Sequence, residues 1–168
     1  MNFNVDFDQA PLLLIWEATR ACALECRHCR AEAINERNPD ELTLDQGKQL
    51  LDDTRAMGTP IVVFTGGDPL QRDDLDLLIT HAKSIGLRVG TIPATTERLT
   101  KDRIVRLQQA VDQMAVSIDA PNAKAHDDFR QVPGCFDKAM EAGAWARQPH
   151  LRVDQVPDLP DHARGTHQ

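Results

Sequence analysis

The sequence has no long apolar segment and no excess of positive charge. Its longest apolar run, 12–16, is far shorter than the roughly 20 residues that span a bilayer. The N-terminus also lacks the basic segment followed by an apolar one that marks secretion, so neither secretion nor membrane insertion is indicated. The formal net charge is -7 at pH 7, which provides no basic surface for a phosphate backbone, so we expect no nucleic-acid partner.

Cysteine is scarce but clustered. The chain has four cysteines in 168 residues, and three of them, Cys22, Cys26 and Cys29, fall within one short segment. Without a secretion signal, this pattern favours thiol or metal chemistry in a reducing cytoplasm over a disulfide framework. The hydrophobic fraction of 41% and the charged fraction of 27% are ordinary for a globular protein, and the length suits one compact domain.

Short apolar runs alternate with helical patterns along the first part of the chain. We expect the strand at 12–15 to be buried on both faces of a parallel sheet. The alternation has the size of βαβ units, so it predicts an α/β fold, either a (β/α) barrel or an open doubly wound sheet. The further strands are expected at 61–64, 87–92 and 114–118, and the helices at 43–57, 73–85, 100–109 and 135–147.

The last segment, 148–168, has neither a strand nor a helix pattern. It contains three prolines and three histidines, at positions 150, 162 and 167, among scattered charges. We therefore expect a core over 1–147 and an irregular, disordered tail over 148–168, whose histidines have no role.

The three clustered cysteines follow the first expected strand directly. Parallel α/β folds place reactive groups at this edge, and gaps of three and two residues let one loop wrap its thiolates around an iron–sulfur cluster or a zinc ion. A cubane cluster has four irons, so three thiolates leave one iron open unless the distant Cys135 binds it. An open iron can bind S-adenosylmethionine and pass an electron to it. A structural zinc site with His28 as fourth ligand is the alternative.

The spacing Cys-x3-Cys-x2-Cys resembles the signature of radical S-adenosylmethionine (radical SAM) enzymes, and two later segments are also similar to that family. Segment 64–70 resembles the family's Gly-Gly-Glu-Pro motif, which holds the methionine amino group, with Asp68 in place of the usual glutamate. Segment 116–136 is similar to the fourth-strand region of members that modify peptides or make haem. The resemblance covers residues 8–147.

The resemblance implies a partial TIM-like (β/α) barrel, with about four βα units present, that holds a 4Fe-4S cluster and S-adenosylmethionine. The three clustered cysteines would bind the cluster, and no catalytic residue is implied beyond it. The residues implied to contact S-adenosylmethionine are His28, Gly66, Gly67, Asp68, Pro69, Thr95, Ser117, Asp119 and Arg130.

The activity implied is reductive cleavage of S-adenosylmethionine to a 5′-deoxyadenosyl radical that modifies a peptide or a haem-type precursor. The implied partners are that peptide or small-molecule substrate and an electron donor such as a flavodoxin or a ferredoxin. Family barrels have six βα units, so a C-terminally truncated chain is expected. Its apolar faces would lack cover, which predicts a marginal fold that aggregates. A non-catalytic remnant and a zinc-stabilised binding module are the alternatives.

Several of these residues also have ordinary structural explanations. Ser117 and Asp119 suit the end of a strand, and Arg130 suits a structural ion pair. The glycine pair at 66–67 suits a strand-to-helix turn. Cys135, at the start of an expected helix, is expected to be a small packed residue.

Overall fold

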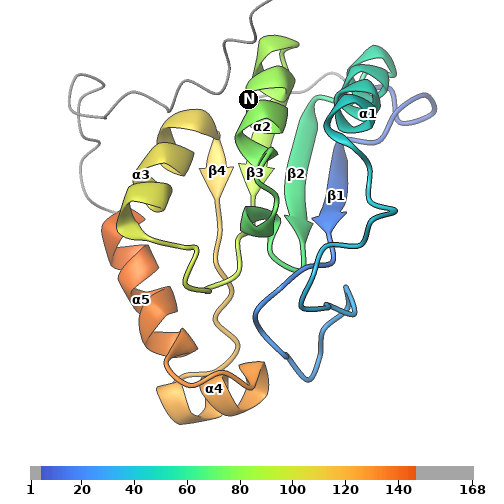
Figure 1. Ribbon diagram of the computed structural model, residues 1–168. Helices are drawn as coiled ribbons and strands as arrows, with labels where there is room; N and C mark the ends of the chain where they lie inside the picture. The colour runs from blue at the N-terminus through green and yellow to red at the C-terminus, as the bar shows by residue number, and fades with distance from the viewer. Residues whose placement is uncertain (1–4, 147–168) are drawn as a thin grey trace, which may run out of the picture.

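A four-stranded parallel sheet forms the centre of the protein, which is seen here in a computed structural model that describes residues 5–146. The strands lie side by side in chain order, and a helix joins each to the next (Figure 1). This arrangement confirms the predicted α/β fold with repeated βα units. The strands are β1 (Leu13–Thr19), β2 (Ile61–Gly66), β3 (Arg88–Thr91) and β4 (Gln113–Met114).

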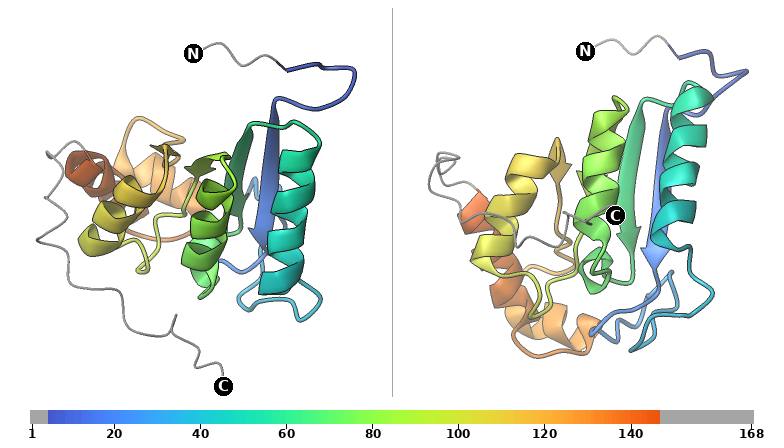
Figure 2. Two further views of the ribbon diagram at one scale, coloured as in Figure 1. Left: turned by 90° about the horizontal axis from the view of Figure 1, so that it is seen from above. Right: turned by 45° about the horizontal axis from the view of Figure 1, so that its top comes forward.

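The connecting helices cover one face of the sheet. Figure 2 shows α1 (Leu44–Ala56), α2 (Leu75–Ser84) and α3 (Lys101–Ala110) together on that side. Two further helices, α4 (Ala123–Arg130) and α5 (Cys135–Ala146), follow β4. Within residues 5–146, every helix falls short of the length and apolarity needed to cross a membrane.

The helix ends are defined by side chains that the sequence indicated. The hydroxyl of Thr43 accepts a hydrogen bond from the backbone N–H of Gln46, and the Oε1 of Gln46 accepts one from the Thr43 N–H. At the start of α3 the hydroxyl of Thr100 accepts a hydrogen bond from the backbone N–H of Arg103. These two caps confirm the predicted starts of α1 and α3.

The core lies between the sheet and its helices, and it encloses one arginine. Arg72 has no exposed side-chain surface, and it donates to the carbonyl oxygens of Ala18 and Leu42 at 3.0 Å. Its guanidinium also pairs with Asp74 at 2.7 Å and lies 5.7 Å from the centre of the Trp16 ring. The buried charge is thus fully partnered, and it ties β1 to the segment before α2.

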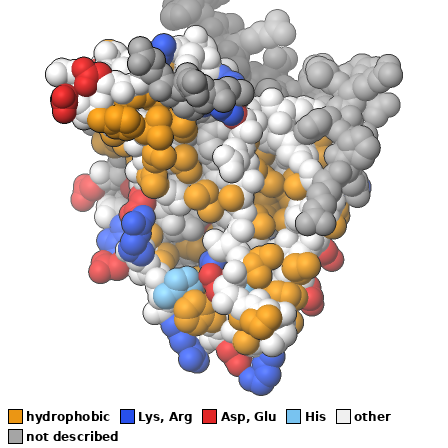
Figure 3. Space-filling model, turned by 180° about the vertical axis from the view of Figure 1, so that it is seen from behind, with side chains coloured by type: hydrophobic (Ala, Val, Ile, Leu, Met, Phe, Trp, Pro, Cys, Tyr) orange, Lys and Arg blue, Asp and Glu red, His pale blue; other side chains and the backbone are white. Residues whose placement is uncertain are grey.

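The first strand is not buried on both faces, so that prediction was wrong. Trp16 and Ala18 point toward the helices and are buried, whereas Leu13 and Ile15 are 38% and 55% exposed. Successive side chains of a strand point to opposite faces, and helices cover only one face here. Hydrophobic side chains therefore gather on the open back of the sheet (Figure 3).

The fourth strand is shorter than predicted, and a helix follows that the sequence did not indicate. Pairing with β3 ends within one residue of Met114, so most of 114–118 leaves the sheet as extended chain. Helix α4 was missed because its sequence is polar and His126 is its one buried residue, which leaves no apolar stripe to recognise. The predicted tail, 148–168, lies outside the described residues.

Candidate functional site

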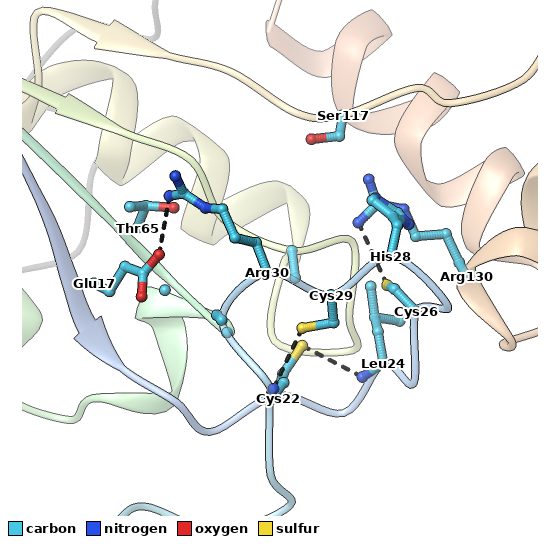
Figure 4. A pocket seen from close by; sticks show the side chains of 15 residues that line it. Glu17, Cys22, Leu24, Cys26, His28, Cys29, Arg30, Thr65, Ser117 and Arg130 are labelled. Atoms are coloured by element: carbon cyan, nitrogen blue, oxygen red, sulfur yellow. Dashed lines mark hydrogen bonds and ion pairs between the residues drawn. The ribbon is translucent and has the colours of Figure 1, made fainter.

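The three clustered cysteines lie in the loop after β1, at the carboxyl edge of the sheet. Cys22 is buried, Cys26 and Cys29 are half-buried, and all three are free thiols. They line a cavity of about 220 Å³ that also meets the ends of β2 and the extended segment after β4 (Figure 4). Of the residues implied to contact the cofactor, the cavity wall includes His28, Gly66, Gly67, Ser117 and Arg130.

Each of the three thiols accepts one N–H hydrogen bond. The backbone of Leu24 donates to Cys22 Sγ at 3.4 Å, and the backbone of Ala33 donates to Cys29 Sγ at 3.3 Å. The donor to Cys26 Sγ is instead a side chain, Nη1 of Arg130, at 3.7 Å. N–H donors of this kind suit sulfur atoms that carry negative charge, as metal-bound thiolates do.

Burial opposes ionisation of these thiols in the metal-free protein. It raises the pKa of the Cys22 thiol to about 11. Burial also raises the pKa of Cys26, although the nearby charge and hydrogen bond of Arg130 act in the opposite direction. Metal ligation requires thiolates, so binding of a metal at these cysteines would release protons.

Gly66 and Gly67 lie directly against the chain that enters the cysteine loop. The N–H of Gly67 donates to the carbonyl of Thr19 at 2.8 Å, and the N–H of Asp68 donates to that of Ala21 at 2.8 Å. A β-carbon on Gly67 would approach the carbonyl oxygen of Ala21 to 2.5 Å. The glycine pair therefore permits the close approach that sets the start of the loop.

The carboxylate of Asp68 is directed into the protein and away from the cavity wall. Asp68 is fully buried and accepts hydrogen bonds from the backbones of Leu70 and Ala94 and from the hydroxyl of Thr96, the last at 2.8 Å. Burial raises the pKa of this carboxyl, while the three donors favour the carboxylate. Asp68 thus joins the loop after β2 to the loop after β3, and sequence analysis missed its partner Thr96. Pro69 is buried as the first residue of the short 3-10 helix η1 (Pro69–Gln71).

Thr95 and Cys135 belong to a neighbouring cavity. This cavity of about 520 Å³ lies on the other side of Leu24 and includes both residues in its wall. Cys135 is buried at the start of α5, which confirms the expected packed position. Thr95 is therefore absent from the wall of the cavity that the three clustered cysteines line, although its neighbour Ala94 belongs to that wall.

Helix α4 contacts the cysteine loop through its last residues. The N–H of Arg27 donates to the carbonyl of Phe129 at 3.1 Å, and the His28 ring stacks on the Phe129 ring with centroids 4.2 Å apart. Arg130 contacts Cys26, as described above. Three consecutive loop residues are thus held by the end of one helix.

Asp119 connects this helix end to the segment after β4. Its carboxylate accepts a hydrogen bond from Nε of Arg130 at 2.5 Å, and its own N–H donates to Nδ1 of the fully buried His126 at 3.1 Å. Nε2 of His28 lies 3.9 Å from the same carboxylate. The expected ion pair of Arg130 is confirmed, with Asp119 as its partner.

The three loop thiols are spaced more widely than the ligands of a single zinc ion. A tetrahedral zinc with bonds to sulfur of about 2.3 Å keeps its sulfurs within about 4 Å of one another. Within residues 5–146, three potential ligand atoms gather within 4.8 Å of one another only at His126, Asp127 and Cys135, so the loop thiols are spread more widely. The His28 ring is engaged by Phe129. The donor set fits a cubane, in which each thiolate binds its own iron.

The group at His126, Asp127 and Cys135 serves the fold. The carboxylate of Asp127 accepts hydrogen bonds from the backbones of Gly134 and Phe136, which fixes the turn that starts α5. These contacts give the acidic side chain a structural task.

The sequence profile of the Radical SAM superfamily matches residues 16–160, which is most of the chain. The chain belongs to the radical SAM superfamily. The family's cofactors are the 4Fe-4S cluster and S-adenosylmethionine that the motifs implied, and three thiols with one N–H donor each fit such a cluster.

Relatives with assigned activities are similar over most of this chain. The AdoMet-dependent heme synthase of Oleidesulfovibrio alaskensis is 43% identical over 144 residues, which are 85% of this chain and 37% of the relative. A PqqA peptide cyclase of Bradyrhizobium diazoefficiens is 30% identical over an alignment of 161 residues that covers 89% of this chain and 42% of the relative. The chain therefore spans well under half the length of these radical SAM proteins.

Solved structures show the same fold. Streptococcus suis SuiB bound to S-adenosylmethionine has a TM-score of 0.70 at 17% identity, over 82% of this chain and 32% of that one. Methylornithine synthase has a TM-score of 0.65 at 19% identity, over 84% of this chain and 43% of that one. These likenesses show that the α/β fold of this chain recurs in part of both structures.

Proposed function

We propose that Cys22, Cys26 and Cys29 bind a 4Fe-4S cluster and that S-adenosylmethionine binds beside it to start radical chemistry. The observation that carries the proposal is the set of three thiols around one cavity at the carboxyl edge of a parallel sheet, in a chain of this family. When bound, these cofactors supply one-electron cleavage of a carbon–sulfur bond, which yields methionine and the 5′-deoxyadenosyl radical.

The wall of the cavity suggests how the chain would hold S-adenosylmethionine. We expect the amino group at the backbone of Gly66 and Gly67, with the buried Asp68 supporting that turn from behind. Ser117 and Arg130 lie across the cavity and are donors suited to a carboxylate (Figure 4). Contacts to the cofactor remain predictions for five further residues, namely His28, Asp68, Pro69, Thr95 and Asp119.

The named relatives support a haem-type precursor or a peptide as substrate. A heme synthase is 43% identical to this chain and a peptide cyclase is 30% identical. We favour the haem-type precursor on the higher identity. Reduction of the cluster requires an electron donor, and a flavodoxin or a ferredoxin is suited to this role. Free thiols that bind a cluster need a reducing compartment, which the cytoplasm provides.

A second candidate is cofactor binding without turnover. It is favoured by the exposure of Ile15 on the open back of the sheet and of Ile118 in the segment after β4, at 55% and 53%, because a site open to solvent does not shield the reductive cleavage step from water. This candidate predicts a cluster that binds S-adenosylmethionine without forming 5′-deoxyadenosine.

The test is anaerobic reconstitution with iron and sulfide, followed by dithionite and S-adenosylmethionine and chromatography for 5′-deoxyadenosine. The proposal predicts a brown protein that forms 5′-deoxyadenosine, and a colourless, nucleoside-free Cys26→Ala variant. A wild-type chain without cluster absorbance would contradict the proposal, and a cluster without 5′-deoxyadenosine would favour the second candidate.

A further inference from the structure

The hydrogen bond between Arg130 and Cys26 differs from those at the other two thiols. Cys22 and Cys29 accept from backbone N–H groups, which are neutral, whereas Cys26 accepts from a guanidinium. The Arg130 side chain is only 13% exposed, so water screens its charge weakly. The three ligand positions are therefore electrostatically unequal.

Arg130 is held in this position from two sides. The carboxylate of Asp119 accepts from its Nε, and the N–H of Asp119 is in turn bound by Nδ1 of the fully buried His126. Phe129, the residue before it, is fixed by the N–H of Arg27 and by the stacked ring of His28. These contacts fix the end of α4, and Figure 4 shows the guanidinium of Arg130 next to the thiol of Cys26.

We propose that Arg130 sets the reduction potential of the cluster through Cys26, and that Asp119 moderates this effect. The inference rests on the proposed cluster and goes beyond it, because it concerns a residue that acts through a ligand. Reduction adds one electron, and therefore one negative charge, to the cluster. A fixed positive charge and an N–H donor at a ligand sulfur both stabilise the reduced form, so Arg130 raises the potential.

The account predicts opposite signs for the two partners. Arg130→Gln removes the positive charge beside Cys26 and lowers the potential. Asp119→Asn removes the negative charge that offsets the guanidinium and raises the potential. Arg130→Lys keeps the charge but loses the planar guanidinium that donates to both Asp119 and Cys26. Its reduction potential should therefore lie between those of Arg130→Gln and the wild type.

Arg27 provides the matched control. It directly follows Cys26 in the cysteine loop and carries the same charge as Arg130, but it is exposed. Within residues 5–146 the contact recorded for Arg27 is made by its backbone, to the carbonyl of Phe129. Arg27→Gln therefore changes the net charge as much as Arg130→Gln does, with little effect on the potential.

The experiment is a redox titration of the full, reconstituted chain, followed by electron paramagnetic resonance of the reduced cluster. It is done without S-adenosylmethionine, so that any contact of Arg130 with the carboxylate of that cofactor cannot contribute. We expect Arg130→Gln to shift the one-electron equilibrium at least tenfold toward the oxidised form, which corresponds to about 59 mV. Asp119→Asn shifts it in the opposite direction.

Equal potentials in the wild type and Arg130→Gln would overturn the proposal, and so would an equal shift in Arg27→Gln. A purely structural Arg130 would lower the amount of bound cluster and leave its potential unchanged. If Arg130→Gln takes up no cluster, the other two variants test the proposal. It then requires a lower reduction potential in Arg130→Lys and a higher one in Asp119→Asn. A wild-type chain without a cluster would overturn the proposed function as well, whereas a cluster indifferent to Arg130 would overturn this inference alone.

Discussion

Gly66 lies against the backbone of Thr19 so closely that no side chain fits between them. A β-carbon on Gly66 would overlap with the carbonyl oxygen of Thr19, and the φ angle of Gly66 is +131°, which residues with a side chain rarely adopt. The end of β2 is thereby pressed onto the chain that leads into the cysteine loop. This contact couples the glycine pair to the position of Cys22.

We predict that Gly66→Ala destabilises the metal-free protein by at least about 2 kcal/mol, because overlap and an unfavourable φ act together. Urea unfolding followed by circular dichroism measures the loss. Gly143→Ala is the control, since it lies in α5 and an added β-carbon meets nothing within 4 Å. That variant gains about 0.5–1 kcal/mol from helix propensity. Equal stabilities of the two variants would contradict the structure of the turn.

Asp68 is expected to stabilise the protein without any cofactor. Its carboxylate accepts three hydrogen bonds in a buried position, one of them from Thr96. Asp68→Asn should lower the free energy of unfolding of the metal-free protein by about 1–3 kcal/mol, and Thr96→Val by about 1 kcal/mol. If the carboxylate of Asp68 served only to contact S-adenosylmethionine, neither substitution would change the unfolding midpoint of the metal-free protein.

The pair of Arg72 and Asp74 makes stability depend on pH in the acid range. Burial alone would raise the pKa of the Asp74 carboxyl, but the hydrogen bond and the charge of Arg72 outweigh it and lower that pKa below 3.8. The native state therefore binds fewer protons than the unfolded state near that pH, so the stabilisation is present above pH 3.8 and is lost as pH falls through the lower native pKa.

Asp74→Ala tests this pair directly. The substitution leaves the buried guanidinium of Arg72 without its carboxylate, so it should cost about 3 kcal/mol at pH 7. It should also flatten the loss of stability in acid, as urea midpoints at several pH values from neutral to strongly acidic would show. An acid dependence as steep as that of the wild type would assign the effect to other carboxylates.

The sequence predicted the parts of this protein that depend on near neighbours. The capping of α1 by Thr43 and Gln46, the βα alternation and the placement of the three cysteines after β1 all follow from local spacing. The glycine pair was likewise recognisable, because Gly66 follows a β-branched run directly. Each of these features involves residues a few positions apart.

The missed features join residues that are far apart along the chain. Cys26 and Arg130 are separated by 104 positions, and Asp68 and Thr96 by 28, so no local pattern shows either contact. The exposure of Leu13 depends on which face of the sheet the helices cover, and a short apolar run alone does not reveal that. Such pairings arise only when the strands align in parallel.

The measurement that tests the central claim most directly is quantification of iron, sulfide and zinc in the reconstituted chain, together with its Cys26→Ala and Cys135→Ser variants. We predict about four irons and four sulfides per chain in the wild type and in Cys135→Ser, as expected for one cubane, and loss of both in Cys26→Ala. One tightly held zinc in place of iron, or a cluster that depends on Cys135 and survives loss of Cys26, would contradict the account.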